Sequence, residues 1–495
     1  MIESLETAPA VLCSRPYGDD LELCASASDD ARPLVLSSSP GRPRQDDCSC
    51  YTASCTVDAA PCRPGTLWQL PRGLYRAPLT AGQELVFNLD GPTGVVVVLN
   101  RPASRILDAY ARPQPLSSTI SRRLAARGIL SPTSGRRVRS HSDQPRTLTG
   151  WLHITDACNL RCEYCYLHHS NRRMNAETGL AALETVFRAA DRGGYRAVNL
   201  KYTGGEPMLY VSMVRALHER AAALAAGSGL DLHAVVLSNG TLLTDEMIDW
   251  FLGEGVQLTV SLDGVGAAHD VQRPFADGWG SFAHVARNVD RALARGLTPY
   301  LSITVTPDNA PYLSDTVRFA LDRGLLFNLN FVRQSSRSVY GLRADQARLL
   351  VGLEAAFGVI EESLPPYRLI DGLLDRSAFD VRHRYPCGAG RNYLVIGPRG
   401  RVTRCQMSMD QPVTDIWADD PLRAVRNHGG GFENLSVEEK EPCGECPWRY
   451  WCAGGCPLLA YRAAARSDVP SPYCDVYRAL YPELLRLEGL RLLQR

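Results

Sequence analysis

Lysine and long apolar runs are what this 495-residue sequence has least of. Lysine occurs only at Lys201 and Lys440, so nearly all of the positive charge is arginine. The formal net charge of +1 gives no overall electrostatic attraction to nucleic acid or to an anionic membrane. No apolar run approaches the roughly 20 residues that a membrane-spanning helix needs. We therefore expect neither a nucleic-acid partner nor a membrane partner.

The N-terminus also lacks the pattern of a secretory signal. Residues 1–6 read MIESLE, which is acidic and has no basic segment followed by an apolar one. The sequence therefore predicts a cytoplasmic protein, whose thiols stay reduced. In that compartment the sixteen cysteines indicate metal ligands before disulfides.

Two segments precede the region that carries the motifs. Residues 1–65 are rich in Ser, Pro, Asp and Cys and show no helical or strand period, which predicts a disordered extension. The role of its cysteines stays open; they are Cys13, Cys24, Cys48, Cys50, Cys55 and Cys62. Residues 66–130 predict a small α+β domain with strands at 84–89 and 95–99. Two helices are expected after them, at 103–110 and 116–127.

The order of elements in residues 66–130 resembles the winged-helix peptide-recognition element of peptide-modifying systems. That resemblance implies a domain that binds a leader peptide, and the alternative is a plain structural cap. A basic, polar linker is expected at 131–148.

Residues 149–335 repeat a strand followed by a helix six times. The expected strands are 151–155, 197–203, 232–238, 257–262, 299–305 and 326–332. Alternating β and α units with short buried strands predict a parallel sheet, here a partial (β/α)6 barrel of the TIM type. In such folds the chemistry lies at the carboxyl ends of the strands. A bridging region at 336–384 and a C-terminal domain at 385–495 complete the expected organisation.

A cysteine motif follows the first of these strands directly. Residues 158–165 read CNLRCEYC, so Cys158, Cys162 and Cys165 stand at CxxxCxxC spacing. Three such thiolates can hold three irons of a 4Fe–4S cluster and leave the fourth iron without a protein ligand. A structural zinc site is the alternative, but three cysteines without a clear fourth ligand serve it poorly.

The ends of the following strands carry further polar motifs. They read GGEP at 204–207, SNGT at 238–241 and SLDG at 261–264, with Arg273 shortly after the last. Over about 150–333 the chain resembles the radical S-adenosylmethionine (SAM) superfamily. The resemblance implies that the three cysteines bind the cluster that binds SAM. It also implies these SAM-binding residues: Tyr164, Gly204, Gly205, Glu206, Ser261, Arg273 and Leu329.

The C-terminal region has a second cysteine array. It reads Cys387-x12-Gly-x4-Cys405, then Cys443-x2-Cys446-x5-Cys452-x3-Cys456, with Cys474 further on. Its order over about 385–480 resembles the SPASM domain, which carries two auxiliary 4Fe–4S clusters. That resemblance implies an outer cluster on Cys443, Cys446, Cys452 and Cys474. It also implies an inner cluster on Cys387, Cys405 and Cys456, which lacks a fourth cysteine. Two zinc ribbons are the alternative, but seven thiolates leave one zinc site short.

The sequence also bears on the kind of reaction. Anaerobic sulfatase maturases, which make formylglycine, resemble the chain over both domains and carry an aspartate base after the cysteine matching Cys405. Here that position is Gln406, an amide that cannot take a proton near neutral pH. An extra cysteine that those enzymes carry before the position of Cys387 is also missing. Both departures count against formylglycine formation.

We therefore expect a radical SAM/SPASM peptide maturase with SAM and three 4Fe–4S clusters as cofactors. The resemblance implies reductive cleavage of SAM to a 5′-deoxyadenosyl radical, which abstracts hydrogen from the substrate. The expected result is an oxidative crosslink, thioether or carbon–carbon, in a ribosomally made precursor peptide. A flavodoxin or ferredoxin is the expected electron donor. The alternatives are modification of a protein side chain, of a redox-cofactor precursor peptide, or a non-catalytic metal scaffold.

Overall fold

The structure is a computed structural model, and it describes most of the chain. The described residues are 33–38, 66–91, 93–133, 145–333, 346–370, 372–380 and 382–494. Most of the predicted extension, with its six cysteines, lies outside them. No described helix is long and apolar enough to cross a membrane.

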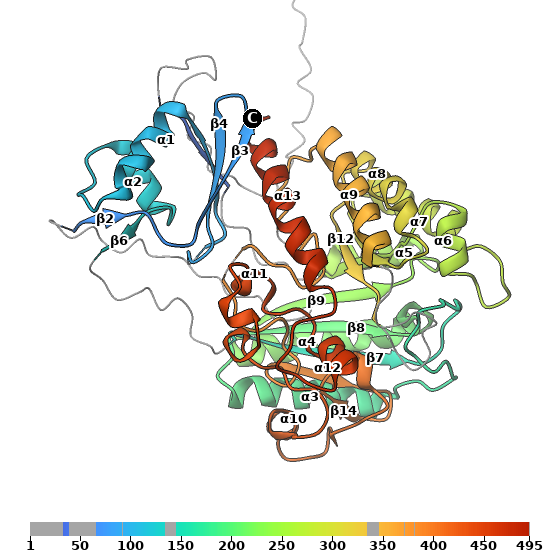
Figure 1. The fold of residues 1–495 in the computed structure, drawn as a ribbon. Coiled ribbons are helices and arrows are strands. Elements are labelled where there is room, and N and C mark those ends of the chain that lie inside the picture. The colour runs from blue at the N-terminus through green and yellow to red at the C-terminus, as the bar shows by residue number, and fades with distance from the viewer. Residues whose placement is uncertain are drawn as a thin grey trace, which may run out of the picture.

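A parallel sheet forms the middle of the molecule (Figure 1). Its six parallel strands are β7 Thr147–Thr155, β8 Ala197–Gly204, β9 Asp231–Ser238, β10 Gln257–Ser261, β11 Tyr300–Val305 and β12 Phe327–Phe331. They are hydrogen-bonded in chain order, from β7 to β12. The predicted parallel sheet is thus confirmed, and each strand begins and ends within four residues of its expected bounds.

Helices connect the parallel strands and cover the sheet. They are α3 Ala176–Arg192, α4 Val211–Ser228, α5 Asp245–Glu254, α6 Ala267–Gln272, α7 Phe282–Ala294, α8 Leu313–Asp322 and α9 Gln346–Glu362. Local sequence fixes where several of them begin. The side chain of Asn175 accepts a hydrogen bond from the Thr178 amide at the start of α3, and Thr244 accepts one from Met247 at the start of α5.

The C-terminal region extends this sheet instead of forming a separate one. Strand β13 Tyr393–Ile396 pairs in parallel with β7, so that Leu394 lies opposite Gly150. Strands β14 Arg401–Thr403 and β15 Thr414–Asp415 continue the sheet in antiparallel pairing. The helices that follow are α10 Pro421–Asn427, α11 Arg449–Cys452, α12 Pro457–Ala464 and α13 Cys474–Leu493. Because β13 joins β7, the cysteines of the C-terminal region are tied to the strand that precedes the CxxxCxxC loop.

Short 3-10 helices complete the assignment. They are η1 Ala109–Ala111, η2 Pro207–Tyr210, η3 Ala310–Tyr312, η4 Gln406–Ser408, η5 Val437–Glu439 and η6 Cys443–Glu445. Three of them, η4, η5 and η6, lie in or beside the C-terminal cysteine array.

The N-terminal domain is a second, antiparallel sheet with two helices (Figure 1, blue). Its strands are β3 Leu74–Thr80, β4 Gln83–Asn88 and β5 Val96–Asn100, followed by α1 Arg101–Asp108 and α2 Thr119–Ala126. A two-stranded pair, β2 Trp68–Gln69 and β6 Ser131–Pro132, lies beside them. The expected elements of residues 66–130 do not include β3. Pro78 lies within it, and β3 is an edge strand, where proline is tolerated.

One strand of this sheet comes from the predicted extension. Strand β1 Val35–Ser37 pairs antiparallel with β5, with Val35 opposite Leu99. Ser38 continues the pairing, because its amide donates to the Val96 carbonyl at 3.0 Å. Residues 33–38 therefore differ from the disorder expected of residues 1–65.

Helix α13 lies between the N-terminal domain and the barrel helices, and it contacts both (Figure 1, red). Its carboxylate Glu488 and guanidinium Arg491 are almost fully buried and form an ion pair at 2.7 Å. Glu488 also accepts a hydrogen bond from the Leu369 amide at 3.1 Å. The last helix thus uses a buried charge pair where the N-terminal sheet meets the central domain.

Removal of one member of this pair should destabilise the whole assembly. We expect Glu488→Ala to lower the free energy of unfolding by about 3–5 kcal/mol, since the buried charge of Arg491 loses its carboxylate partner. Glu361→Ala is the matched control: its carboxylate pairs with Arg486 on the exposed face of α9, so the loss should stay below about 1 kcal/mol. Urea unfolding followed by circular dichroism measures both, and equal losses would contradict the expectation.

Candidate active site

The CxxxCxxC loop follows β7 closely, and its backbone is hydrogen-bonded to another segment of the chain. The amides of Arg161 and Glu163 donate to carbonyls of the segment after α6, at Pro274 (2.8 Å) and Gln272 (3.2 Å). Across this contact Leu160 forms a bridge with Phe275. The backbone of the loop that carries the three cysteines is therefore fixed by the neighbouring segment.

The thiols of this loop lie close to one another and are largely shielded from water. Burial raises the pKa of the Cys158 thiol to about 11 and that of Cys162 to about 12, and Cys165 adds to both shifts by its charge. The side chain of His169 contacts the Cys165 sulfur at 3.5 Å. Free thiols with such pKa values are protonated near neutral pH, so binding of a cluster must release protons.

The turn after β8 packs tightly against the start of the cysteine loop. The Gly205 amide donates to the Thr155 carbonyl at 2.7 Å, and the Glu206 amide donates to the Ala157 carbonyl at 2.9 Å. A Cβ atom on Gly204 would lie 2.4 Å from the Thr155 oxygen, and one on Gly205 would lie 2.2 Å from the Ala157 oxygen. Gly204 also has a φ of +151°. Only glycines allow the two strand ends to approach this closely.

The Glu206 carboxylate is fully buried and connects two strand ends. One oxygen accepts from the Met208 amide at 3.0 Å and from the Ser238 hydroxyl at 2.9 Å. The other accepts from the Asn239 amide at 2.7 Å. Burial raises the pKa of Glu206, and these hydrogen bonds oppose the rise. The geometry thus holds the carboxylate rigidly at the end of β8.

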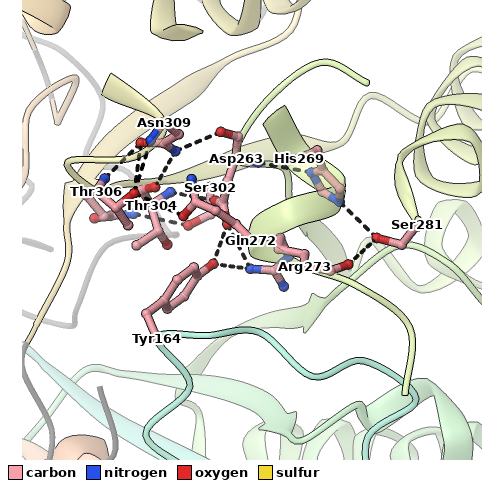
Figure 2. A network of polar contacts seen from close by, with 11 residues as sticks. Tyr164, Asp263, His269, Gln272, Arg273, Ser281, Ser302, Thr304, Thr306 and Asn309 are labelled. Atoms are coloured by element: carbon pink, nitrogen blue, oxygen red, sulfur yellow. Dashed lines mark hydrogen bonds and ion pairs between the residues drawn. The ribbon is translucent and has the colours of Figure 1, made fainter. Parts of the chain in front are cut away.

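A polar network joins the cysteine loop to the end of β10 (Figure 2). The Tyr164 hydroxyl donates to Asp263, and the Arg273 guanidinium contacts both the hydroxyl and the carboxylate. The other oxygen of Asp263 accepts from the Thr304 amide at 2.7 Å. Arg273 is 8% exposed, so its charge is paired with Asp263 in a largely buried setting.

The neutral His269 contacts Ser281, which in turn hydrogen-bonds to the backbone of Arg273 (Figure 2). The Asp263 amide donates to His269 Nδ1 at 3.2 Å, and the Ser281 hydroxyl donates to the Arg273 carbonyl at 2.6 Å. His269 Nε2 lies 3.1 Å from the same hydroxyl, which leaves Nε2 as the donor. Burial, and then the charge of Arg273, lower the pKa of His269 to about 3. His269 is therefore uncharged and fixes the segment that carries Arg273.

The remaining predicted SAM contacts lie on strands of the same sheet. Ser261 is the last residue of β10 and lies opposite Ser302 of β11. Leu329 of β12 is fully buried in the hydrophobic core, and its carbonyl accepts from the Asp375 amide at 2.9 Å. Their roles in binding SAM stay predictions.

The structure adds residues that the motifs alone did not assign. Asp263 lies at the centre of the network in Figure 2, and Asn309 donates to its carbonyl at 2.7 Å. Asn239 binds Glu206 through its amide, and its side chain lies 3.9 Å from the Cys158 sulfur. Asn239 and Asp263 lie one and two residues after the end of a strand, which was the signal available for finding them.

The C-terminal cysteines divide between two cavities. Four of them line a cavity of about 270 Å³ beside α11 and α13: Cys443, Cys446, Cys452 and Cys474. The other three line a narrower cavity between the barrel and α12: Cys387, Cys405 and Cys456. This division matches the predicted outer and inner groups.

The thiols of the outer cavity are close enough to affect one another. Burial raises the pKa of Cys443 to about 11 and that of Cys452 to about 12, and neighbouring cysteines add to both shifts. The ten described cysteines form no disulfide. Among the described residues no three metal-ligating side chains converge as for a single ion. A 4Fe–4S cluster has each thiolate on a different iron, so its ligands need not converge on one point.

Gln406 lies at the inner cavity beside Cys405. Its side-chain oxygen accepts from the Tyr393 hydroxyl at 3.0 Å and lies 3.6 Å from the Cys405 sulfur. The Tyr393 ring in turn packs edge-on against Trp151 of β7, with 6.3 Å between the ring centres. An aromatic pair therefore connects the barrel to the inner group of cysteines.

Known proteins share both the sequence pattern and the fold. The Radical SAM superfamily model matches residues 152–320. The serine-type anaerobic sulfatase-maturating enzyme of Klebsiella aerogenes is 32% identical over 371 residues, which are 68% of this chain and 87% of that enzyme. The mycofactocin maturase MftC of Mycolicibacterium smegmatis is 26% identical over 67% of this chain and 83% of its own length.

A solved structure agrees with the fold. Native anSMEcpe with bound AdoMet and Cp18Cys peptide superimposes with a TM-score of 0.53 and 17% identity, over 69% of this chain and 99% of that one. The family expected from the cysteine loop and the GGEP turn is thus confirmed. The chain belongs to the radical SAM superfamily and is an enzyme of that superfamily.

Proposed function

We propose that this enzyme oxidatively crosslinks residues of a ribosomally made peptide, with SAM and three 4Fe–4S clusters as its cofactors. The observation that carries the proposal is the grouping of the cysteines into three sets. One set follows β7, a second lines a cavity together with Tyr393 of β13, the partner of β7, and the third lines a cavity beside α11 and α13. When bound, SAM and the clusters supply a 5′-deoxyadenosyl radical and one-electron transfer.

The chain's own residues hold and orient these cofactors. Cys158, Cys162 and Cys165 would ligate the first cluster, and Gly204 and Gly205 keep the backbone of the next turn within reach of it. The Glu206 carboxylate is buried and held by three hydrogen bonds, and it would bind the amino group of SAM. On the other side of the loop the Arg273 guanidinium contacts the Tyr164 hydroxyl, and the Arg273 backbone is held by Ser281. These contacts aim the cofactor and exclude water from it.

The two auxiliary sites fit clusters by their donor chemistry. Cys443, Cys446, Cys452 and Cys474 supply four thiols around one cavity, as a complete 4Fe–4S ligand set does. The inner cavity has three cysteines among its described lining residues, so one iron there would take a ligand of another kind. That arrangement suits a site that exchanges an electron with a bound substrate.

A crosslink and formylglycine formation are both two-electron oxidations, and the residue at position 406 favours the crosslink. The substrate loses one hydrogen atom to the 5′-deoxyadenosyl radical, then one electron and one proton as the new bond closes. Formylglycine formation in the resembling maturases uses an aspartate base, and here Gln406 occupies that position with its oxygen engaged by Tyr393. Relatives named sulfatase-maturating enzyme and mycofactocin maturase support a protein or peptide substrate for this chain.

The N-terminal domain is proposed to bind the leader segment of the peptide. Its sheet takes up a short extended segment from outside residues 66–130, because Val35–Ser37 pairs antiparallel with β5. Main-chain hydrogen bonds of this kind bind peptides of varied sequence. The winged-helix likeness of residues 66–130 and the predicted cytoplasmic location are parts of this proposal, as is a flavodoxin or ferredoxin as electron donor.

Metal analysis tests the cofactor assignment. Anaerobically reconstituted protein should contain about twelve irons, and replacement of Cys158, Cys162 and Cys165 together by Ala should remove about four of them. This variant should lose reductive SAM cleavage completely, whereas Cys456→Ala should retain part of it. Stoichiometric zinc with iron for a single cluster would contradict the assignment of auxiliary clusters.

Substitution at the centre of the polar network tests the SAM site. Asp263→Asn should weaken SAM binding about tenfold, because the neutral amide no longer pairs with Arg273 and disturbs Tyr164. Asp270→Asn is the control in the same segment, where the side chain only accepts from the Phe282 amide at 2.7 Å. Isothermal titration with SAM measures both variants, and equal affinities would show that the network does not serve SAM.

Product mass tests the reaction itself. A peptide encoded beside the gene should become about two hydrogen masses lighter per crosslink, because each bond costs the substrate two hydrogens. One 5′-deoxyadenosine should form for each crosslink under turnover conditions. A gain of a methyl group, or an aldehyde formed from one Cys or Ser, would show that the reaction belongs to another class.

A further inference from the structure

Lys440 is one of only two lysines in the chain, and it is buried between the two C-terminal cysteine groups. Its side chain is 2% exposed. It follows η5, and its Nζ donates to the Ala453 carbonyl at 3.0 Å. Ala453 stands between Cys452 of the outer group and Cys456 of the inner group. The ammonium is thus fixed at the turn that connects the two sites.

The charge of Lys440 acts on cysteines of both groups. Burial lowers the pKa of Lys440, and four thiols oppose that change: Cys443 and Cys452 of the outer cavity, and Cys387 and Cys456 of the inner one. Burial raises the pKa of the Cys443 thiol, and the charge of Lys440 lowers it in turn. One positive charge is therefore shared by two sets of sulfur ligands.

No carboxylate of the described residues pairs with this ammonium. Its acidic neighbours in sequence are engaged elsewhere or exposed. Glu438 contacts Arg384 at 3.0 Å, and Glu439 accepts from the Ser436 amide at 2.9 Å. Glu441 is exposed, and its charge acts on Arg466. Since an ammonium has three donors and a full charge, burial of this kind is costly unless anionic groups lie nearby. Clusters bound through thiolates would supply that negative charge.

The turn around Lys440 has an unusual backbone. Ala453, Gly454 and Gly455 have φ values of +46°, +79° and +71°, so three consecutive residues are left-handed. A Cβ atom on Gly454 would lie 2.8 Å from Lys440 Cδ and 3.1 Å from its Nζ. The Lys440 side chain therefore fills the concave side of the turn and stabilises it through the Ala453 carbonyl.

We propose that Lys440 is an electrostatic positioning residue for both auxiliary clusters, and that its buried ammonium raises their reduction potentials. Each cluster with its thiolates carries net negative charge and gains one electron on reduction. A nearby positive charge in a medium of low dielectric favours the more negative, reduced state. Both clusters would accordingly accept an electron from the substrate radical more readily. The inference rests on the proposed auxiliary clusters.

Three substitutions separate the charge of Lys440 from its hydrogen bond. Lys440→Met removes both, Lys440→Gln keeps a donor for the Ala453 carbonyl, and Lys440→Arg keeps the charge. Arg466→Met is the matched control, since it removes an exposed cation of the same region whose charge water and salt screen. All four are made in the protein that lacks Cys158, Cys162 and Cys165, so that only auxiliary clusters contribute signals.

Redox titration with dithionite, followed by electron paramagnetic resonance, measures the potentials. At a fixed potential the ratio of reduced to oxidised cluster should fall about tenfold in Lys440→Met and Lys440→Gln. It should stay near the parent value in Lys440→Arg and Arg466→Met. Iron and sulfide content is determined for every variant.

Three outcomes would overturn the inference. Unchanged potentials in both neutral variants would show that the charge is irrelevant. A parent-like potential in Lys440→Gln alone would assign Lys440 only to the turn. Loss of the clusters from both neutral variants, with normal loading of Lys440→Arg, would show that the ammonium serves retention and not potential. Absence of auxiliary signals in the parent protein would instead refute the proposed function.

Discussion

The close contact between the turn after β8 and the loop after β7 is the constraint on which the site depends. It leaves no room for a Cβ atom at Gly204 or Gly205, and it is closed by main-chain hydrogen bonds to Thr155 and Ala157. Because Glu206 follows immediately, the same contact determines where its carboxylate lies. The cysteine loop and the proposed amine site therefore cannot shift independently, and each strand end fixes its neighbour.

The polar residues around this contact form one continuous support. Glu206 connects β8 to the end of β9 through Asn239, whose side chain reaches the Cys158 sulfur. On the other side Asp263 connects β10 to the cysteine loop through Tyr164. Buried polar groups that hydrogen-bond to one another in this way make a site rigid. The loop between them carries no regular structure of its own, and its order comes from these neighbours.

The sequence predicted the parts of the fold that depend on local pattern. The six parallel strands were found because short buried strands alternate with amphipathic helices. The cysteine groups followed from spacing and family resemblance. Strand β13 could not be placed, because its pairing with β7 joins segments far apart in sequence. Strand β1 was missed for the same reason, since three residues in a polar extension give no signal until β5 is present.

The central position of Asp263 could not be predicted either, although its motif was recognised. A strand end offers several polar side chains, and only the folded structure shows which one meets Tyr164 and Arg273. Motifs in a sequence thus identify the class of cofactor better than they identify the residues that orient it.

The pairing of β7 with β13 explains how chemistry in the barrel can be coupled to a site in the C-terminal region. Trp151 of β7 packs against Tyr393 of β13, and the Tyr393 hydroxyl binds Gln406 beside Cys405. A peptide held over the end of β7 would therefore lie near both the SAM site and the inner cysteines. An oxidative reaction needs this proximity, because the substrate radical must lose its electron before it reacts with anything else. In the proposed reaction, the sheet that carries the CxxxCxxC loop would also carry the electron acceptor at the inner cysteines, so the two half-reactions would share one frame.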